Sequence, residues 1–160
     1  MVKHRFQAQA LVEFALVIML LLVLIFGILE GGRLLFIYGA VVNASREAAR
    51  YGSVEGYNEA GNLYYQDCAA IRNTARRVAF FQNLQDSDIV IQYDTGPGTA
   101  IVDTCTGSVD TGVKITYNPD VANSPRDRII VTVKGKFTTV VRNLPFNNML
   151  INKTSERTII

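Results

Sequence analysis

Histidine and cysteine are scarce in this 160-residue chain, which contains one histidine, His4, and two cysteines, Cys68 and Cys105. The cysteines lie far apart and form no CxxC motif, so the chain lacks the residues that build a zinc site. Proline and glycine are too few, and too irregularly placed, for a disordered or collagen-like chain. The length suits one compact domain with an extra element and argues against a multidomain enzyme. We therefore expect no metal site, no cofactor and no enzyme activity.

Charged residues are also in short supply, at 19% of the chain, against about 25% in an average soluble domain. Lysine and arginine exceed aspartate and glutamate by two, and both surplus positive charges precede Gln9. The remainder has no net charge and offers no large electrostatic footprint for nucleic acid. A local cluster of Arg72, Arg76 and Arg77 is typical of the solvated face of a helix.

The apolar residues are concentrated in one run of twenty, Ala10 to Leu29, which contains a single charge, Glu13. As a helix this run would span about 30 Å, the thickness of the hydrocarbon core of a bilayer. A secretory signal has a shorter apolar region with a small-residue cleavage site, and a soluble core helix has a polar stripe. The run has neither, so we interpret it as a membrane helix. Positive charges precede the run, which predicts a cytoplasmic N-terminus. The membrane would then separate His4 from the outer residues, and this excludes a Ser-His-Asp triad.

Helical spacing of apolar residues continues beyond the run to Tyr51, and Gly52 follows where a helix stop is expected. A continuous helix from Gln9 would be about 65 Å long. Its central glycines indicate a bend or close helix packing, or are merely tolerated; both readings stay open. Two oppositely charged pairs lie three positions apart and are expected to form helix ion pairs: Glu30 with Arg33, and Glu47 with Arg50.

Glu13 is the most informative residue, because it is the only charge inside the apolar run and follows Gln9 by four positions. A carboxylate within a bilayer is costly, and such residues usually serve a function with a specific partner. The run itself contains no lysine or arginine. Two interpretations remain. Glu13 is protonated or reaches the near interface, or it pairs with a positive group supplied by processing or by a neighbouring subunit.

After Gly52 the composition predicts a small α+β domain. A Gly-, Asn- and Tyr-rich loop is followed by Asp67, which is a plausible N-cap for a helix over residues 68–81. Four segments then have strand character, three of them from apolar residues at period two: residues 89–93, 113–117, 129–137 and, more weakly, 150–160. Helices followed by strands predict an α+β fold with a mostly antiparallel sheet.

Candidate chemistry in this outer part is limited. Cys68 and Cys105 are expected to form one disulfide between the second helix and the long loop between strands; the alternative is two thiols in a reducing compartment. Three loop aspartates are better explained as solvated acids than as calcium ligands: Asp94, Asp103 and Asp110. Gly96-Pro97-Gly98 lacks the strand-to-helix context of a phosphate loop. Three tyrosines are either a contact surface or core residues: Tyr57, Tyr64 and Tyr65.

The N-terminal third carries a specific pattern. The small residue Ala8 is followed by QALVEFAL, a long apolar stretch, a Glu-x-x-Arg at residues 30–33 and a helix end at Tyr51. In order and spacing this pattern resembles TadE-like proteins, which are pilins or pseudopilins of the tight-adherence branch of the type IV pilus system. The resemblance covers about residues 7–53. Ala8 stands where glycine is commoner, and small size is retained.

The resemblance implies a processing step. Prepilin peptidase would cleave between Ala8 and Gln9, which makes Glu13 the fifth residue of the mature chain. The new amine of Gln9 would supply the positive charge that the run lacks, within one subunit or across to a neighbour. Glu13 and Phe14 would then set the axial register of a subunit that joins an assembly.

The resemblance also implies a type IV pilin-like architecture in three parts: a cytoplasmic leader over 1–8, a long helix over 9–52 that is transmembrane in its first half, and an extracytoplasmic α+β domain over 53–160. We predict a structural subunit, anchored in the cytoplasmic membrane and polymerised into a surface pilus or pseudopilus for adhesion or secretion. Its expected partners are further copies or other pilins, prepilin peptidase, the inner-membrane assembly machinery and, before assembly, the lipid bilayer. The alternative is a permanently anchored ectodomain that acts as a binding module without polymerising.

Overall fold

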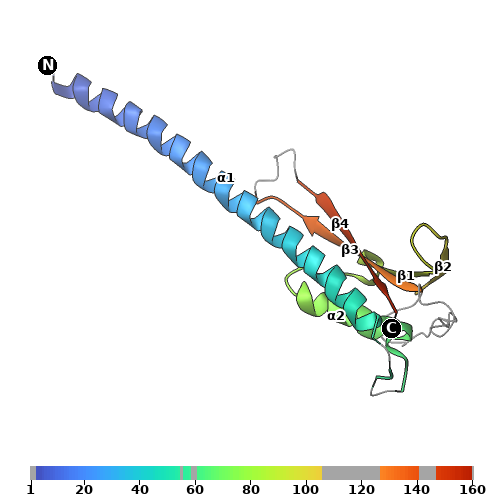
Figure 1. Ribbon diagram of the computed structural model, residues 1–160. Coiled ribbons are helices and arrows are strands. Elements are labelled where there is room, and N and C mark those ends of the chain that lie inside the picture. The colour runs from blue at the N-terminus through green and yellow to red at the C-terminus, as the bar shows by residue number, and fades with distance from the viewer. Residues whose placement is uncertain (1–2, 55, 59–60, 106–126, 141–146, 160) are drawn as a thin grey trace. The chain divides into compact units, whose positions relative to one another are not determined.

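The computed structural model describes residues 3–54, 56–58, 61–105, 127–140 and 147–159 (Figure 1). Its residues group into two compact units, Met1–Phe36 and Ile37–Ile160. Helix α1, Lys3–Gly52, has residues in both. The predicted strand at residues 113–117 lies outside the described residues.

The first unit consists of helix. In α1 the helical hydrogen bonding is continuous from Lys3 to Gly52, through every glycine in its middle. All side chains from Gln9 to Leu29 are exposed in the structure. A Cβ placed at Gly27, Gly31 or Gly32 would meet no other group within 4 Å. Among the described residues of this single chain, therefore, no close contact requires these glycines.

The second unit is built on a four-stranded antiparallel sheet in the order β2-β1-β3-β4. The strands are β1 (Ile89–Asp94), β2 (Ile101–Thr104), β3 (Arg128–Phe137) and β4 (Met149–Thr158). Helix α2 (Cys68–Val78) and two short 3-10 helices, η1 (Tyr64–Gln66) and η2 (Asp86–Asp88), precede the sheet in the chain. The α+β class with one short helix and an antiparallel sheet is therefore confirmed.

The core of this unit lies between the sheet and residues 37–52 of α1. Apolar side chains alternate along the two central strands, so one face of the sheet is buried: Ile89, Ile91, Tyr93, Ile129, Val131 and Val133. A stripe of small α1 residues is fully buried against this face, and includes Val41, Ala44 and Ala48. The approach is close, because a Cβ at Gly135 of β3 would overlap the Val41 side chain. Gly52 allows a similar approach to Ile129.

Two elements differ from the sequence predictions. Helix α2 ends at Val78, earlier than expected, and its C-cap Ala79 donates its backbone N–H to the carbonyl of Ala75. The short edge strand β2 was missed and interpreted as loop. It has no alternation of apolar residues, and it forms through backbone pairing with β1, across an irregularity between Tyr93 and Asp94. The final weak segment is confirmed as β4.

Candidate functional site

Glu13 lies on the exposed surface of α1 in the first unit. The side-chain Nε2 of Gln9 donates a hydrogen bond of 3.2 Å to Glu13 Oε1, one helical turn away. Every other side chain between Ala10 and Leu29 is apolar or glycine. By length and composition the stretch Gln9–Gly52 qualifies as a membrane-spanning helix, and its most apolar part is not buried in the structure. The arrangement places one carboxylate, with an amide one turn away, near the start of a lipid-compatible surface.

Both predicted helix pairs are close in the structure. Arg33 Nη1 lies 3.6 Å from Glu30 Oε2 in the first unit. In the second unit Arg50 donates twice to Glu47, with Nε 2.9 Å from Oε2. The hydrogen bond from Arg50 lowers the pKa of Glu47 below its ordinary value, and the same bond raises the pKa of Arg50. The more exposed of the two, Glu47 with Arg50, stabilises the helix only slightly.

Cys68 and Cys105 form a disulfide with Cα atoms 5.9 Å apart. Cys68 is the first residue of α2 and Cys105 follows β2, so the bond joins this helix to the edge of the sheet. Both cysteines are almost completely buried. The disulfide is therefore enclosed by the fold of the second unit.

A buried polar cluster surrounds the disulfide. Arg72 Nη2 donates to the carbonyl of Cys105 at 2.9 Å, and Tyr93 Oη donates to the carbonyl of Tyr65 at 2.6 Å. Tyr93 Oη also lies 3.3 Å from the sulfur of Cys105. Burial raises the pKa of Tyr93 and lowers that of Arg72. These groups connect α2, η1 and the end of β2 through polar contacts that water does not reach.

The interpretation of the arginine cluster as a solvated face was wrong for Arg72, which is only 4% exposed. It follows Cys68 by one helical turn, so it faces the disulfide and the sheet. That spacing was the available signal in the sequence. Arg76 is half-buried and binds the Leu84 carbonyl and the Asp86 carboxylate, whereas Arg77 is exposed as expected.

Residues 8–50 match the family model described as TadE-like protein. The chain contains a TadE-like domain. The matched range lies entirely within α1 and includes Glu13 and both helix ion pairs. No curated protein and no solved structure matches the chain. TadE-like sequence on a hydrophobic N-terminal helix suggests a pilin-like protein associated with a Tad pilus system.

The remaining candidates lie outside the TadE-like domain. Asp94 is buried and ion-paired with Arg128, which lowers the Asp94 pKa through their hydrogen bonds, and Asp103 accepts the backbone N–H of Thr104. Asp110 lies outside the described residues, among which no group of three or more His, Cys, Asp or Glu could hold a metal ion. Of the tyrosines, Tyr57 is exposed and Tyr65 is buried.

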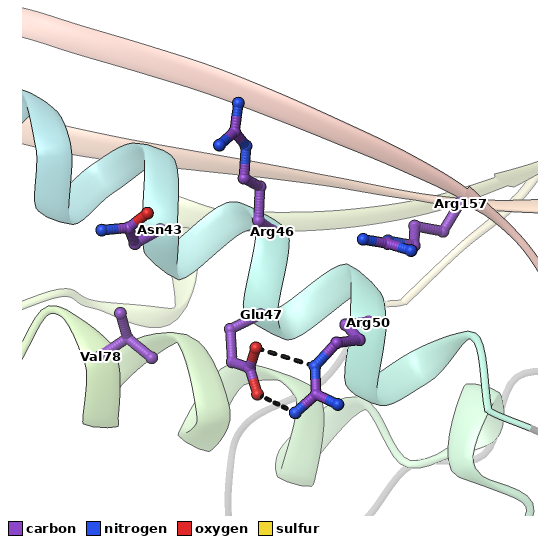
Figure 2. A pocket seen from close by; sticks show the side chains of 6 residues that line it. All are labelled: Asn43, Arg46, Glu47, Arg50, Val78 and Arg157. Atoms are coloured by element: carbon purple, nitrogen blue, oxygen red, sulfur yellow. Dashed lines mark hydrogen bonds and ion pairs between the residues drawn. The ribbon is translucent and has the colours of Figure 1, made fainter.

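Sequence reasoning missed a basic groove between the end of the TadE-like domain and β4 in the second unit. Its volume is about 370 Å³, and Figure 2 shows the residues that line it: Asn43, Arg46, Glu47, Arg50, Val78 and Arg157. In this view Arg46 extends away from α1, Arg157 reaches toward the helix from β4, and Glu47 is paired with Arg50. The sequence held no signal for this groove, because Arg157 lies far from Arg46 along the chain.

Proposed function

We propose that this protein is a pilin-like structural subunit, anchored in the membrane and then polymerised through its N-terminal helix into a pilus or pseudopilus. One observation carries the proposal. The TadE-like match over residues 8–50 coincides with a continuous helix whose apolar run contains a single charge, Glu13. A lipid-facing surface of this kind can be transferred from bilayer to the core of a helical assembly, since both environments are apolar.

Processing is the first step of the proposed mechanism. Residues 1–8 form a cytoplasmic leader, and prepilin peptidase cleaves between Ala8 and Gln9. The α-amine freed at Gln9 is positively charged near neutral pH. The contact between Gln9 and Glu13 supports a pairing one turn along the helix. In an apolar environment the carboxylate gains far more from a cation than it would in water.

Register is the second step. An incoming subunit carries one carboxylate and one amine at the same end of a helix with no other charge before Glu30. Pairing Glu13 with the amine of a neighbour stabilises one axial position over displaced ones, because only that position brings a second subunit's amine to the carboxylate in an apolar core. Phe14, the next residue, then packs against the neighbouring helix at the same axial position as the Glu13 pair.

The outer part, residues 53–160, then faces away from the cytoplasm. Its enclosed disulfide supports this location, since disulfides persist in oxidising compartments. Other pilins and the inner-membrane assembly machinery are the proposed partners before the subunit reaches a surface filament.

Mass spectrometry of the mature chain tests the proposal, combined with electron microscopy of sheared surface material and identification of its peptides. We expect an N-terminus at Gln9 and peptides of this chain in the filament fraction. An intact Met1, or cleavage beyond Leu29, would contradict the proposal. A membrane fraction that holds the whole chain with no filaments would favour the permanently anchored ectodomain.

A further inference from the structure

Two arginines from distant parts of the chain converge in the second unit. Arg46 of α1 and Arg157 of β4 both line the groove described above. They also both line an adjoining depression of about 440 Å³ that is bordered by three hydroxyl side chains: Ser53, Ser155 and Thr158. Figure 2 shows Arg46 and Arg157 extending from different elements beside the same stretch of α1.

Neither Arg46 nor Arg157 forms an ion pair or hydrogen bond with any residue in the described part of the chain. The two acids of the lining are already bonded, Glu47 to Arg50 and Glu156 to Arg128, and the charge of Arg157 also acts on Glu47. Like charges held at one groove repel, and an oxyanion between them would relieve this. Across the groove and the adjoining depression, the lining therefore carries more positive than negative side chains.

In the part of this unit that the structure describes, the acids bind other groups. From residue 37 onward, every described carboxylate except that of the buried Asp127 already accepts a hydrogen bond or ion pair: Glu47, Asp67, Asp86, Asp88, Asp94, Asp103 and Glu156. No described acid of this unit therefore fills the site, and an anion from another molecule can reach it. Arginine favours carboxylate and phosphate oxygens, because its planar guanidinium donates two parallel hydrogen bonds.

We propose that this groove binds an acidic side chain of a neighbouring subunit, with the carboxylate held between Arg46 and Arg157. The inference rests on the proposed function, which supplies the neighbour. A carboxylate on a protein surface fits better than a lipid headgroup, because the arginines lie in a depression whose lining is mostly polar. A membrane-docking site would instead carry exposed apolar side chains for insertion, and Val78 is the only apolar residue of this lining.

Site-specific photocrosslinking in cells that make the full chain tests the proposal. A benzoylphenylalanine at position 43 replaces the exposed Asn43 beside both arginines. We expect a crosslink to a pilin-like subunit, at a peptide that contains aspartate or glutamate. The double change Arg46→Glu with Arg157→Glu should lower the crosslink yield at least about tenfold, because it removes both charge-assisted contacts and places two like charges beside the partner's acid. Reversal of the partner's acid to arginine should restore it.

Two further variants separate charge from folding. Arg77→Glu changes an exposed arginine of α2 outside the groove and should leave the yield unchanged. Changing both groove arginines to lysine keeps the charge and removes the two-pronged geometry, so the yield should fall only in part. An intact disulfide on non-reducing gels reports that each variant has folded.

The proposal is overturned if no crosslink forms, if the yield is unchanged in the doubly reversed variant, or if only phospholipid is captured. The mature N-terminus is measured on the same sample. A chain that starts at Gln9 but gives no charge-dependent crosslink removes the groove proposal alone. A chain that retains Met1 removes the proposed function, whatever the groove does.

Discussion

At the scale of single residues, Glu13 carries the proposed assembly step. Glu13→Gln keeps the size of the side chain and removes the charge, so we expect normal membrane insertion and a strong loss of incorporation into filaments. Glu13→Lys should be worse, because it places like charges together at the subunit contact. Quantifying the chain in membrane and sheared filament fractions measures both effects. Wild-type filament yield from Glu13→Gln would remove the register mechanism.

Arg128 links three strands through carboxylates. It donates to Asp94 of β1 at 2.9 Å and to Glu156 of β4 at 2.6 Å. Asp94 is buried, so Arg128→Ala leaves a buried carboxylate without its cation. We expect a loss of roughly 3 kcal/mol in the free energy of unfolding. Urea unfolding of the full chain in detergent, followed by tyrosine fluorescence, measures it, and Lys134→Ala on the same strand serves as the control.

The same pair predicts how stability depends on pH. Hydrogen bonds from Arg128 lower the pKa of Asp94 in the folded protein, so the unfolded chain binds a proton more readily. The stabilisation is therefore complete above the unfolded pKa of about 3.9 and is lost as pH falls through the lower, folded value. Urea midpoints between pH 7 and pH 2 should fall more for the wild type than for Arg128→Ala. Parallel curves would contradict the assignment.

At the scale of elements, the close contact between α1 and the sheet depends on Gly135, which has no side chain. A methyl group at Gly135 would overlap Val41, so Gly135→Ala should destabilise the protein by roughly 1–3 kcal/mol. Gly39→Ala is the matched control, since no other group lies within 4 Å of a Cβ there. It should be neutral, or stabilise the helix by up to about 1 kcal/mol. Thermal unfolding of the full chain in detergent distinguishes the two; equal midpoints would contradict the close approach.

At the scale of the whole molecule, one covalent bond closes the loop between α2 and the sheet edge. Replacing Cys68 and Cys105 by alanine should lower the free energy of unfolding by roughly 3–4 kcal/mol, as the chain-entropy estimate gives for a loop of this length. Because both cysteines are buried, reductant should release thiols only when the chain unfolds. Alkylation after dithiothreitol, with and without urea, checks this. Rapid thiol release in the native state would show that the bond is accessible.

The sequence alone determined the local features of this protein. A membrane-length apolar run, one embedded acid, ion pairs three residues apart and alternation in two central strands all follow from short-range spacing, which the helix and strand periods dictate. The TadE-like pattern is of this kind, since it lies within one helix.

Only the tertiary structure decided which groups meet across the chain. It buried Arg72 against Cys105, formed β2 by backbone pairing, packed Gly135 against Val41 and brought Arg157 beside Arg46. No local period records these contacts, because they depend on how a folded sheet positions residues that are remote in sequence. The helix carries the family pattern, and the packing of the outer unit creates the groove.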